Sequence, residues 1–241
     1  MDEACPAAGS GYILVAMAPT LLLLLLAAPD AHAAPSVSAL RAGLESTSGW
    51  EEVDRRAVGA AGEVVVRHKV VDGADCLEGT ATASGPVELY ATLAADIDHQ
   101  AGWSSWKIPY SKKLSSGASF DYAQVLDNPY PVADRFWFLR GSSFTSGAER
   151  GFRWEPIDGK TAWPQAWGEV ATKFPGAVIP AINVGDWTFS PVGTAQTRVR
   201  YRIRTDAGGN LPDWAGQWAA TKTLPTNIAD LVGEVKRRTG A

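Results

Sequence analysis

Cysteine, methionine and histidine are scarce in this chain, with two, two and three residues among 241. Two cysteines cannot build the disulfide framework of a small secreted scaffold. Basic residues are also in deficit, because 22 lysines and arginines stand against 26 aspartates and glutamates. Proteins that bind nucleic acids usually carry a basic excess that neutralises phosphates. The composition therefore excludes a disulfide-rich scaffold and predicts no nucleic-acid partner.

The sequence motifs of several large enzyme classes are missing as well. There is no Gly-x-Ser-x-Gly, His-Glu-x-x-His, Walker-type or Gly-x-Gly-x-x-Gly sequence. Outside the first forty residues, histidine occurs only as His68, in an apolar strand pattern, and as His99, in an acidic segment. A metal site needs three or four converging ligands. We therefore expect no metal, no cofactor and no enzymatic activity.

The N-terminal segment has the pattern of an export signal. Residues 12–28 form an apolar run with six consecutive leucines. The small-x-small pattern of Ala31 and Ala33 follows, which predicts a cleaved signal peptide over 1–33 and an exported, periplasmic or secreted domain over 36–241. The segment lacks the usual N-terminal positive charge, so an uncleaved membrane anchor stays open as the alternative.

Helical and strand-like patterns alternate in blocks along the remaining chain. Amphipathic spacing predicts short helices at 36–45 and 86–95 and a long terminal helix over 212–238, which Pro225 should kink or shorten. Strand patterns separated by turn signals are found at 50–57, 62–71, 77–84, 103–114, 119–127, 135–144, 150–157, 166–173, 185–192 and 196–205. This order predicts an α+β fold in which a curved antiparallel sheet wraps around the terminal helix.

The last predicted strand, 196–205, alternates strictly between apolar side chains and arginines. The apolar members are Val199, Tyr201 and Ile203, and the basic members are Arg198, Arg200, Arg202 and Arg204. Neighbouring side chains of a strand point to opposite faces of the sheet. The strand therefore predicts one packed face and one basic, solvated face.

Aromatic residues recur at alternate positions of the predicted strands, and ten of the residues in the chain are tryptophans. One helix covers only part of a long curved sheet, so bulky side chains can line an apolar pocket beneath it. The candidate lining residues are His68, Trp106, Phe136, Phe138, Trp187 and Tyr201. Trp214 and Trp218, near the start of the terminal helix, are expected to gate entry.

Two charged residues stand out in the aromatic strands. Arg140 shares a strand face with two phenylalanines, and Asp121 lies on the preceding strand at a separation that suits hairpin pairing. A buried charge costs several kcal/mol unless it is matched, so an inward Arg140 should pair with Asp121. In the opposite orientation Trp137 and Leu139 are buried and Arg140 faces water. Spacing alone leaves both orientations open.

Several segments over 36–238 together resemble the START domains, the steroidogenic-acute-regulatory-related lipid-transfer family of the helix-grip superfamily. The similar segments are SGWEEV, LYATLAADIDHQAGW, PYPVADRFWFLR and VGDWTFSPVGTAQTRVRYRIRTDAGGNLP. Two positions depart from the family pattern. Asp134 and Arg135 occur in swapped order, and Ala207 stands where the family usually has proline.

The resemblance implies a helix-grip fold that encloses a hydrophobic tunnel for one lipid, sterol or phospholipid-like, roofed by the terminal helix. Several family members carry an acidic residue and an arginine deep in the tunnel, and these correspond to Asp121 and Arg140. We therefore expect a non-enzymatic lipid carrier with transient membrane contact. A polyketide cyclase or aromatase on the same fold, or a ligand sensor, remains the alternative.

Overall fold

The computed structural model describes residues 36–128, 132–205 and 222–240. The predicted signal peptide lies outside these residues, as do Trp214, Trp218 and the predicted start of the terminal helix. No helix within the described ranges is long and apolar enough to cross a membrane.

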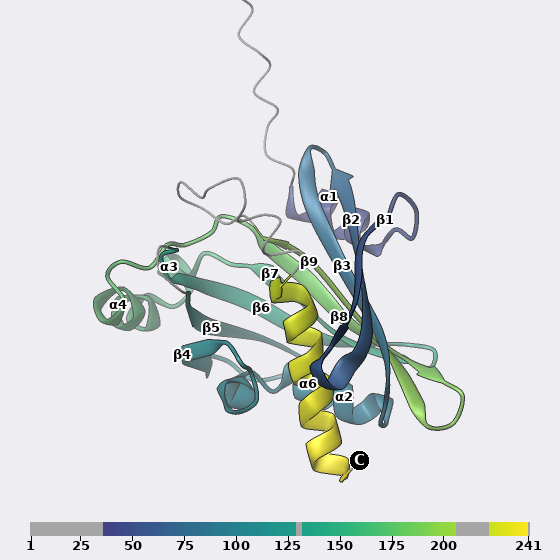
Figure 1. Ribbon diagram of the computed structural model, residues 1–241. Coiled ribbons are helices and arrows are strands. Elements are labelled where there is room, and N and C mark those ends of the chain that lie inside the picture. The colour runs from purple at the N-terminus through teal and green to yellow at the C-terminus, as the bar shows by residue number, and fades with distance from the viewer. Residues whose placement is uncertain (1–35, 129–131, 206–221, 241) are drawn as a thin grey trace, which may run out of the picture. The chain divides into compact units, whose positions relative to one another are not determined.

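A nine-stranded antiparallel sheet forms the centre of the described chain (Figure 1). The strands are β1 (Glu51–Val58), β2 (Gly62–Val71), β3 (Ala74–Ser84), β4 (Lys107–Lys113), β5 (Ser119–Asp127), β6 (Arg135–Ser146), β7 (Glu149–Pro156), β8 (Asn183–Val192) and β9 (Gln196–Thr205). Their spatial order is β1-β2-β3-β9-β8-β7-β6-β5-β4. The sheet is therefore open, with β1 and β4 at its edges.

Helices lie on both faces of this sheet. They are α1 (Val37–Glu45), α2 (Val87–Ala95), α3 (Gly159–Ala162), α4 (Pro164–Lys173) and α6 (Leu224–Thr239), with short 3-10 turns η1 (Gly59–Ala61) and η2 (Ile97–Gly102). Ser36 begins α1 because its hydroxyl accepts the backbone N–H of Ala39 at 3.2 Å. The predicted α+β class and the antiparallel sheet are confirmed.

One sequence-based expectation for the helices was wrong. Residues 166–173, predicted as a strand, belong to helix α4, which begins at Pro164 and buries Val170 one turn beyond Trp167. The apolar residues of this segment are spaced three and four positions apart, as in any amphipathic helix, and this spacing accounts for its helical structure. Pro225 lies in the first turn of α6, where a helix needs no amide donor, and most of the predicted helix before it lies outside the described residues.

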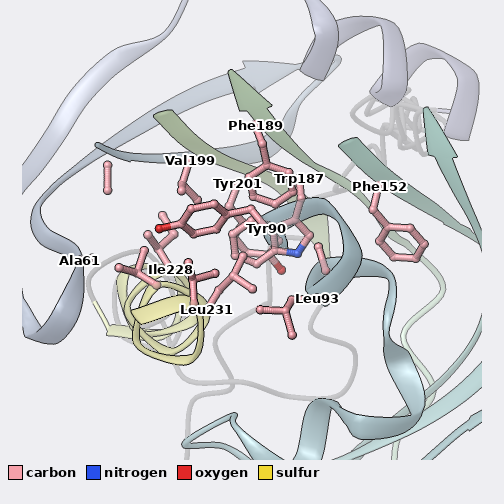
Figure 2. Close-up of a cluster of buried hydrophobic side chains, with 14 of the residues drawn as sticks. Ala61, Tyr90, Leu93, Phe152, Trp187, Phe189, Val199, Tyr201, Ile228 and Leu231 are labelled. Atoms are coloured by element: carbon pink, nitrogen blue, oxygen red, sulfur yellow. The ribbon is translucent and has the colours of Figure 1, made fainter. Parts of the chain in front are cut away.

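The main core lies between one face of the sheet, called here the inner face, and helices α2 and α6. In Figure 2, Tyr90 of α2 and Ile228 and Leu231 of α6 lie against Phe189 and Tyr201 of the sheet. Glycine at position 79 allows α6 to approach β3 closely, since a Cβ there would lie 2.1 Å from a methyl carbon of Leu224. The other face, called the outer face, carries two smaller apolar clusters.

The outer face is not simply solvated, which corrects the expectation for the arginine row of β9. Arg198 is exposed, but Arg202 is only 4% exposed and its Nε donates to Glu78 Oε2 at 2.7 Å. The ring of Trp50 lies 5.6 Å from the Arg202 guanidinium, and α1 buries Leu40 and Leu44 beside it. This cover comes from distant segments, which strand alternation does not reveal.

Candidate functional site

A cavity of about 180 Å³ lies beneath α6, against the inner face. Its wall is built by α2, η2, α6 and by strands β4 to β9. Small-molecule sites in proteins usually measure roughly 300–1,000 Å³. The cavity is smaller than this range, so a sterol-sized guest requires the wall to move.

Stacked aromatic rings form one side of this wall. Trp187 of β8 and Tyr201 of β9 are direct cross-strand partners, and their ring centroids are 4.2 Å apart. Trp154 of β7 stacks on Tyr201 at 5.7 Å, and Phe152 follows at 6.2 Å from Trp154. Burial raises the pKa of the Tyr201 hydroxyl, so it stays neutral. This side offers a rigid, uncharged and mostly apolar surface.

Hydrogen-bonded amides interrupt the apolar wall at two places. Trp154 Nε1 donates to Asn183 Oδ1 at 2.8 Å. Across the cavity, Gln124 Nε2 donates to Gln100 Oε1 at 2.8 Å and to Ser111 Oγ at 3.1 Å. Trp137 Nε1, opposite Gln124 in the β5–β6 register, is buried and has no hydrogen-bond partner among the described residues.

Three of the site residues predicted from the sequence lie in the cavity wall, namely Trp106, Trp187 and Tyr201. The sequence analysis missed Tyr122, Gln124, Trp154 and Asn183 as lining residues. A signal was present, because Tyr122 and Gln124 alternate with Asp121 along β5 and therefore occupy the face opposite to it. Because Asp121 and Arg140 were expected to face inward, the residues on the opposite face of β5 and β6 were not predicted to line the cavity.

The predicted inward orientation of Asp121 and Arg140 was wrong, although the two residues do pair. Arg140 Nε and Nη2 donate to the Asp121 carboxylate at 2.8 and 3.2 Å, but the pair lies on the outer face and the Arg140 side chain is 51% exposed. Trp163 Nε1, just before α4, donates to Asp121 Oδ2 at 3.0 Å. The Arg140 guanidinium, together with the Trp163 bond, outweighs partial burial and lowers the pKa of Asp121. The pair joins α3 and α4 to the sheet and does not line the cavity.

Phe136 and Phe138 were predicted to line the cavity, and this was also wrong. Both rings are buried on the outer face, with centroids 5.4 and 5.6 Å from that of Trp167 in α4. Their neighbours Trp137 and Leu139 face the cavity instead. Because α4 covers the outer face, apolar residues occupy both faces of β6, and alternation could not identify the inner one.

His68 does not lie in the wall of the cavity. Its Nε2 is hydrogen-bonded to Asp75 Oδ1 at 2.7 Å, and the ring is partly exposed. It shares a strand face with the buried Val64 and Val66, but this face leaves the core at the end of β2, where Val70 is exposed. In the part of the chain that the structure describes, no cluster of three or more potential metal ligands occurs.

A clasp connects α6 to the segment after η2. Asp230 Oδ2 accepts hydrogen bonds from the backbone N–H and the hydroxyl of Ser105, both at 2.8 Å. Burial raises the pKa of Asp230, while the bonds from Ser105 act in the opposite direction. Ser104 and Trp106, which flank Ser105, line the cavity, so the clasp holds α6 against the cavity wall.

Three solved structures of similar fold share 13–18% sequence identity with this chain. Human StAR-related lipid transfer protein 5 superimposes with a TM-score of 0.65 at 14% identity, over 83% of this chain and 92% of that one. A STAR-related lipid transfer protein fragment from Xanthomonas axonopodis gives 0.63 at 18% identity, over 78% and 99%. The lipid transfer and protein localization domain of human StarD13 gives 0.60 at 13% identity, over 81% and 93%.

No family model matches the sequence, and no curated protein matches it either. The structural likeness extends over about four fifths of the chain. The chain therefore has the α+β helix-grip fold of the START domains.

Proposed function

We propose that this chain is a non-enzymatic carrier that binds one lipid in the cavity beneath α6. The observation that carries the proposal is the cavity itself, which has a stacked aromatic wall formed by Phe152, Trp154, Trp187 and Tyr201. Each methylene group that moves from water into such a wall contributes roughly 0.8 kcal/mol. A hydrocarbon chain therefore binds without any catalytic group.

The names of the similar structures support this proposal. Each of the three is a lipid transfer protein or domain, and each superimposes on about four fifths of this chain. The likeness is one of fold at 13–18% identity, so the lipid-binding activity itself is our inference for this chain.

The proposal extends to where the carrier works. The apolar run at 12–28 supports export across a membrane, with cleavage after Ala33. An exported carrier would shield its lipid in the aqueous space between two membranes and contact each membrane transiently. Sterols and phospholipids are both candidate cargoes, and each requires a larger cavity than the present 180 Å³.

Extraction of lipid from the purified full-length chain, followed by mass spectrometry, tests the function directly. We expect one class of lipid to copurify in near-stoichiometric amount. Ile108 lines the cavity from β4, so Ile108→Trp should fill part of the space and reduce the lipid recovered by about tenfold. Ile179 is exposed and lies outside the cavity wall, which makes Ile179→Trp the matched control.

The two variants separate cavity binding from adsorption to the surface. Equal lipid content in Ile108→Trp, Ile179→Trp and the unaltered chain would show that the lipid does not occupy the cavity. Complete absence of lipid from all three, together with no uptake from labelled vesicles, would reject the carrier function.

A further inference from the structure

Three polar residues line the cavity from the first residue of β8 and from the beginning of α6. Asn183 is the first residue of β8, Asn227 lies in the first turns of α6, and Thr223 directly precedes that helix. All three line the cavity. We call Asn183, Thr223 and Asn227 the amide cluster. It brings together side chains separated by forty residues in the sequence.

The amide cluster has hydrogen-bonding capacity left for a ligand. Asn183 is 6% exposed, and its Oδ1 accepts the Trp154 indole proton. Its Nδ2 group therefore remains a donor, with no partner in the described ranges. Asn227 partly opposes the effect of burial on the pKa of the Tyr201 hydroxyl, and both residues line the cavity. A buried carboxamide with a free donor can bind an acceptor atom of a guest.

Thr223 provides a second, independent indication. It stands at the position that caps α6, yet its side chain makes no capping hydrogen bond. Its Oγ1 is buried and has no hydrogen-bond partner in the described part of the chain. A buried hydroxyl without a hydrogen bond is destabilising, and an acceptor or donor atom supplied by a ligand would remove this cost.

The polar side chains that line the described part of the cavity are all uncharged. The polar side chains of the described wall are carboxamides, hydroxyls and indoles, for example Gln124, Thr205 and Trp137. A carboxylate or phosphate buried among them would lack a cation, which costs several kcal/mol. The paired charges Asp121 and Arg140 lie on the outer face and cannot neutralise a guest in the cavity.

We propose that the amide cluster binds an uncharged carbonyl oxygen, so that the cargo is a neutral lipid such as an ester or a ketone. The proposal rests on the lipid-carrier function above and specifies which lipids are carried. Donors from Asn183 and Thr223 contact the carbonyl, while the hydrocarbon part lies along Trp187 and Tyr201. Fatty-acid anions and lipids with a buried phosphate are excluded.

A matched pair of ligands tests this selectivity in the full-length chain. Methyl palmitate and palmitic acid have the same hydrocarbon chain and differ in whether the carbonyl group is ionised at neutral pH. Quenching of tryptophan fluorescence on titration gives both affinities. We expect the ester to bind at least about tenfold more tightly. The difference should shrink as the pH falls below the pKa of the free acid, because the protonated acid is neutral.

Variants of the amide cluster locate the selectivity. Thr223→Val and Asn183→Leu preserve the side-chain shape, and each should weaken ester binding by about fivefold while leaving the affinity for hexadecane, which has no polar group, unchanged. Gln165→Leu, on the exposed surface of α4, is the control and should alter neither affinity. If Asn183→Leu fails to fold, the near-isosteric Thr223→Val still gives the answer.

The outcomes distinguish this inference from the carrier function. Equal affinity for the ester and the acid anion at neutral pH would overturn the neutral-carbonyl site and leave the carrier function in place. Equal losses of ester and hexadecane affinity in Thr223→Val would also overturn it, since they indicate a merely structural role. Binding of neither ester nor hexadecane would overturn both proposals.

Discussion

The inner and outer faces of the sheet use the same strands but opposite chemistry. On the inner face, Trp154, Trp187 and Tyr201 stack across β7, β8 and β9. On the outer face, five strands carry charges of alternating sign in one cross-strand register row. This row consists of Arg67, Glu78, Arg202, Asp186 and Arg153. Its two ion pairs, Arg67–Glu78 and Arg202–Glu78, are 2.9 and 2.7 Å long.

The difference shows how one sheet supplies both a binding space and a rigid frame. Aromatic rings are large and stiff, so they can stack and still leave a space between the sheet and α6. Buried charges require a specific partner at a specific distance, so they fix the relative positions of strands. The cavity therefore belongs to the uncharged face, and the following substitutions test that division.

Phe189→Ala should have the largest effect on stability. Phe189 is fully buried on the inner face between Tyr90 and Trp187, with centroids at 5.6 and 6.1 Å. We expect a loss of about 4 kcal/mol in the free energy of unfolding, measured by urea denaturation. Val53→Ala, at a side chain 52% exposed, should cost less than about 0.5 kcal/mol. Similar losses for both would mean that the inner face is not the main core.

Glu78→Gln should have the next largest effect. It removes the carboxylate that pairs with the buried Arg202, so we expect a loss of about 3 kcal/mol in the same denaturation assay. The double variant Glu78→Leu with Arg202→Met should recover most of this loss, because neither charge then remains buried. Glu63→Gln, in the exposed pair with Arg55, should cost only about 0.5 kcal/mol. A double variant no better than Glu78→Gln would contradict this explanation.

Asp186→Asn should change how stability depends on pH. Burial raises the pKa of Asp186, although the Thr188 hydroxyl donates to it at 2.9 Å. Between the ordinary carboxyl pKa and the raised value, the folded chain holds a proton that the unfolded chain has lost. Stability contributed by this group therefore falls as the pH rises through that interval, by at most about 1.4 kcal/mol per pH unit. The asparagine variant should lack this fall.

Glu234 provides a control, because its pKa is shifted in the direction opposite to that of Asp186. Hydrogen bonds from Arg237 and Arg238 lower its pKa to about 2, so its contribution is present above the ordinary value of 4.5 and is lost as the pH falls towards 2. Glu234→Gln should flatten only this acid limb of the stability curve. An unchanged pH profile in both variants would show that neither carboxyl group titrates as described.

Arg140→Leu should have the smallest effect. The Asp121–Arg140 pair is half exposed on the outer face, so we expect a loss below about 1 kcal/mol and no change in ligand affinity. Lipid titration of Arg140→Leu beside Trp137→Leu, which alters the cavity wall, gives the comparison. A larger loss of affinity in Arg140→Leu would restore the inward orientation that the structure contradicts.

Local sequence patterns predicted most elements but not the choice of face. Nine of the ten predicted strands are present, although β4 begins only at Lys107, and the remaining one is helix α4. The alternation of Val199, Tyr201 and Ile203 identified the inner face of β9, since arginines occupied every other position. In β6, apolar residues occur on both faces, so Phe136 and Trp137 could not be told apart by alternation.

The sequence by itself determined the order of strands and helices outside 159–173, the aromatic character of the core and the resemblance to START domains. Only the tertiary structure decided that Arg140 faces outward, that Trp137 faces the cavity, and that Asn183 and Thr223 line it. The physical reason is that periodicity depends on neighbours along the chain, whereas exposure depends on cover from distant segments. Here α4 packs on one face of β6 through Trp167 and α2 packs on the other, and the local sequence pattern of β6 shows neither contact.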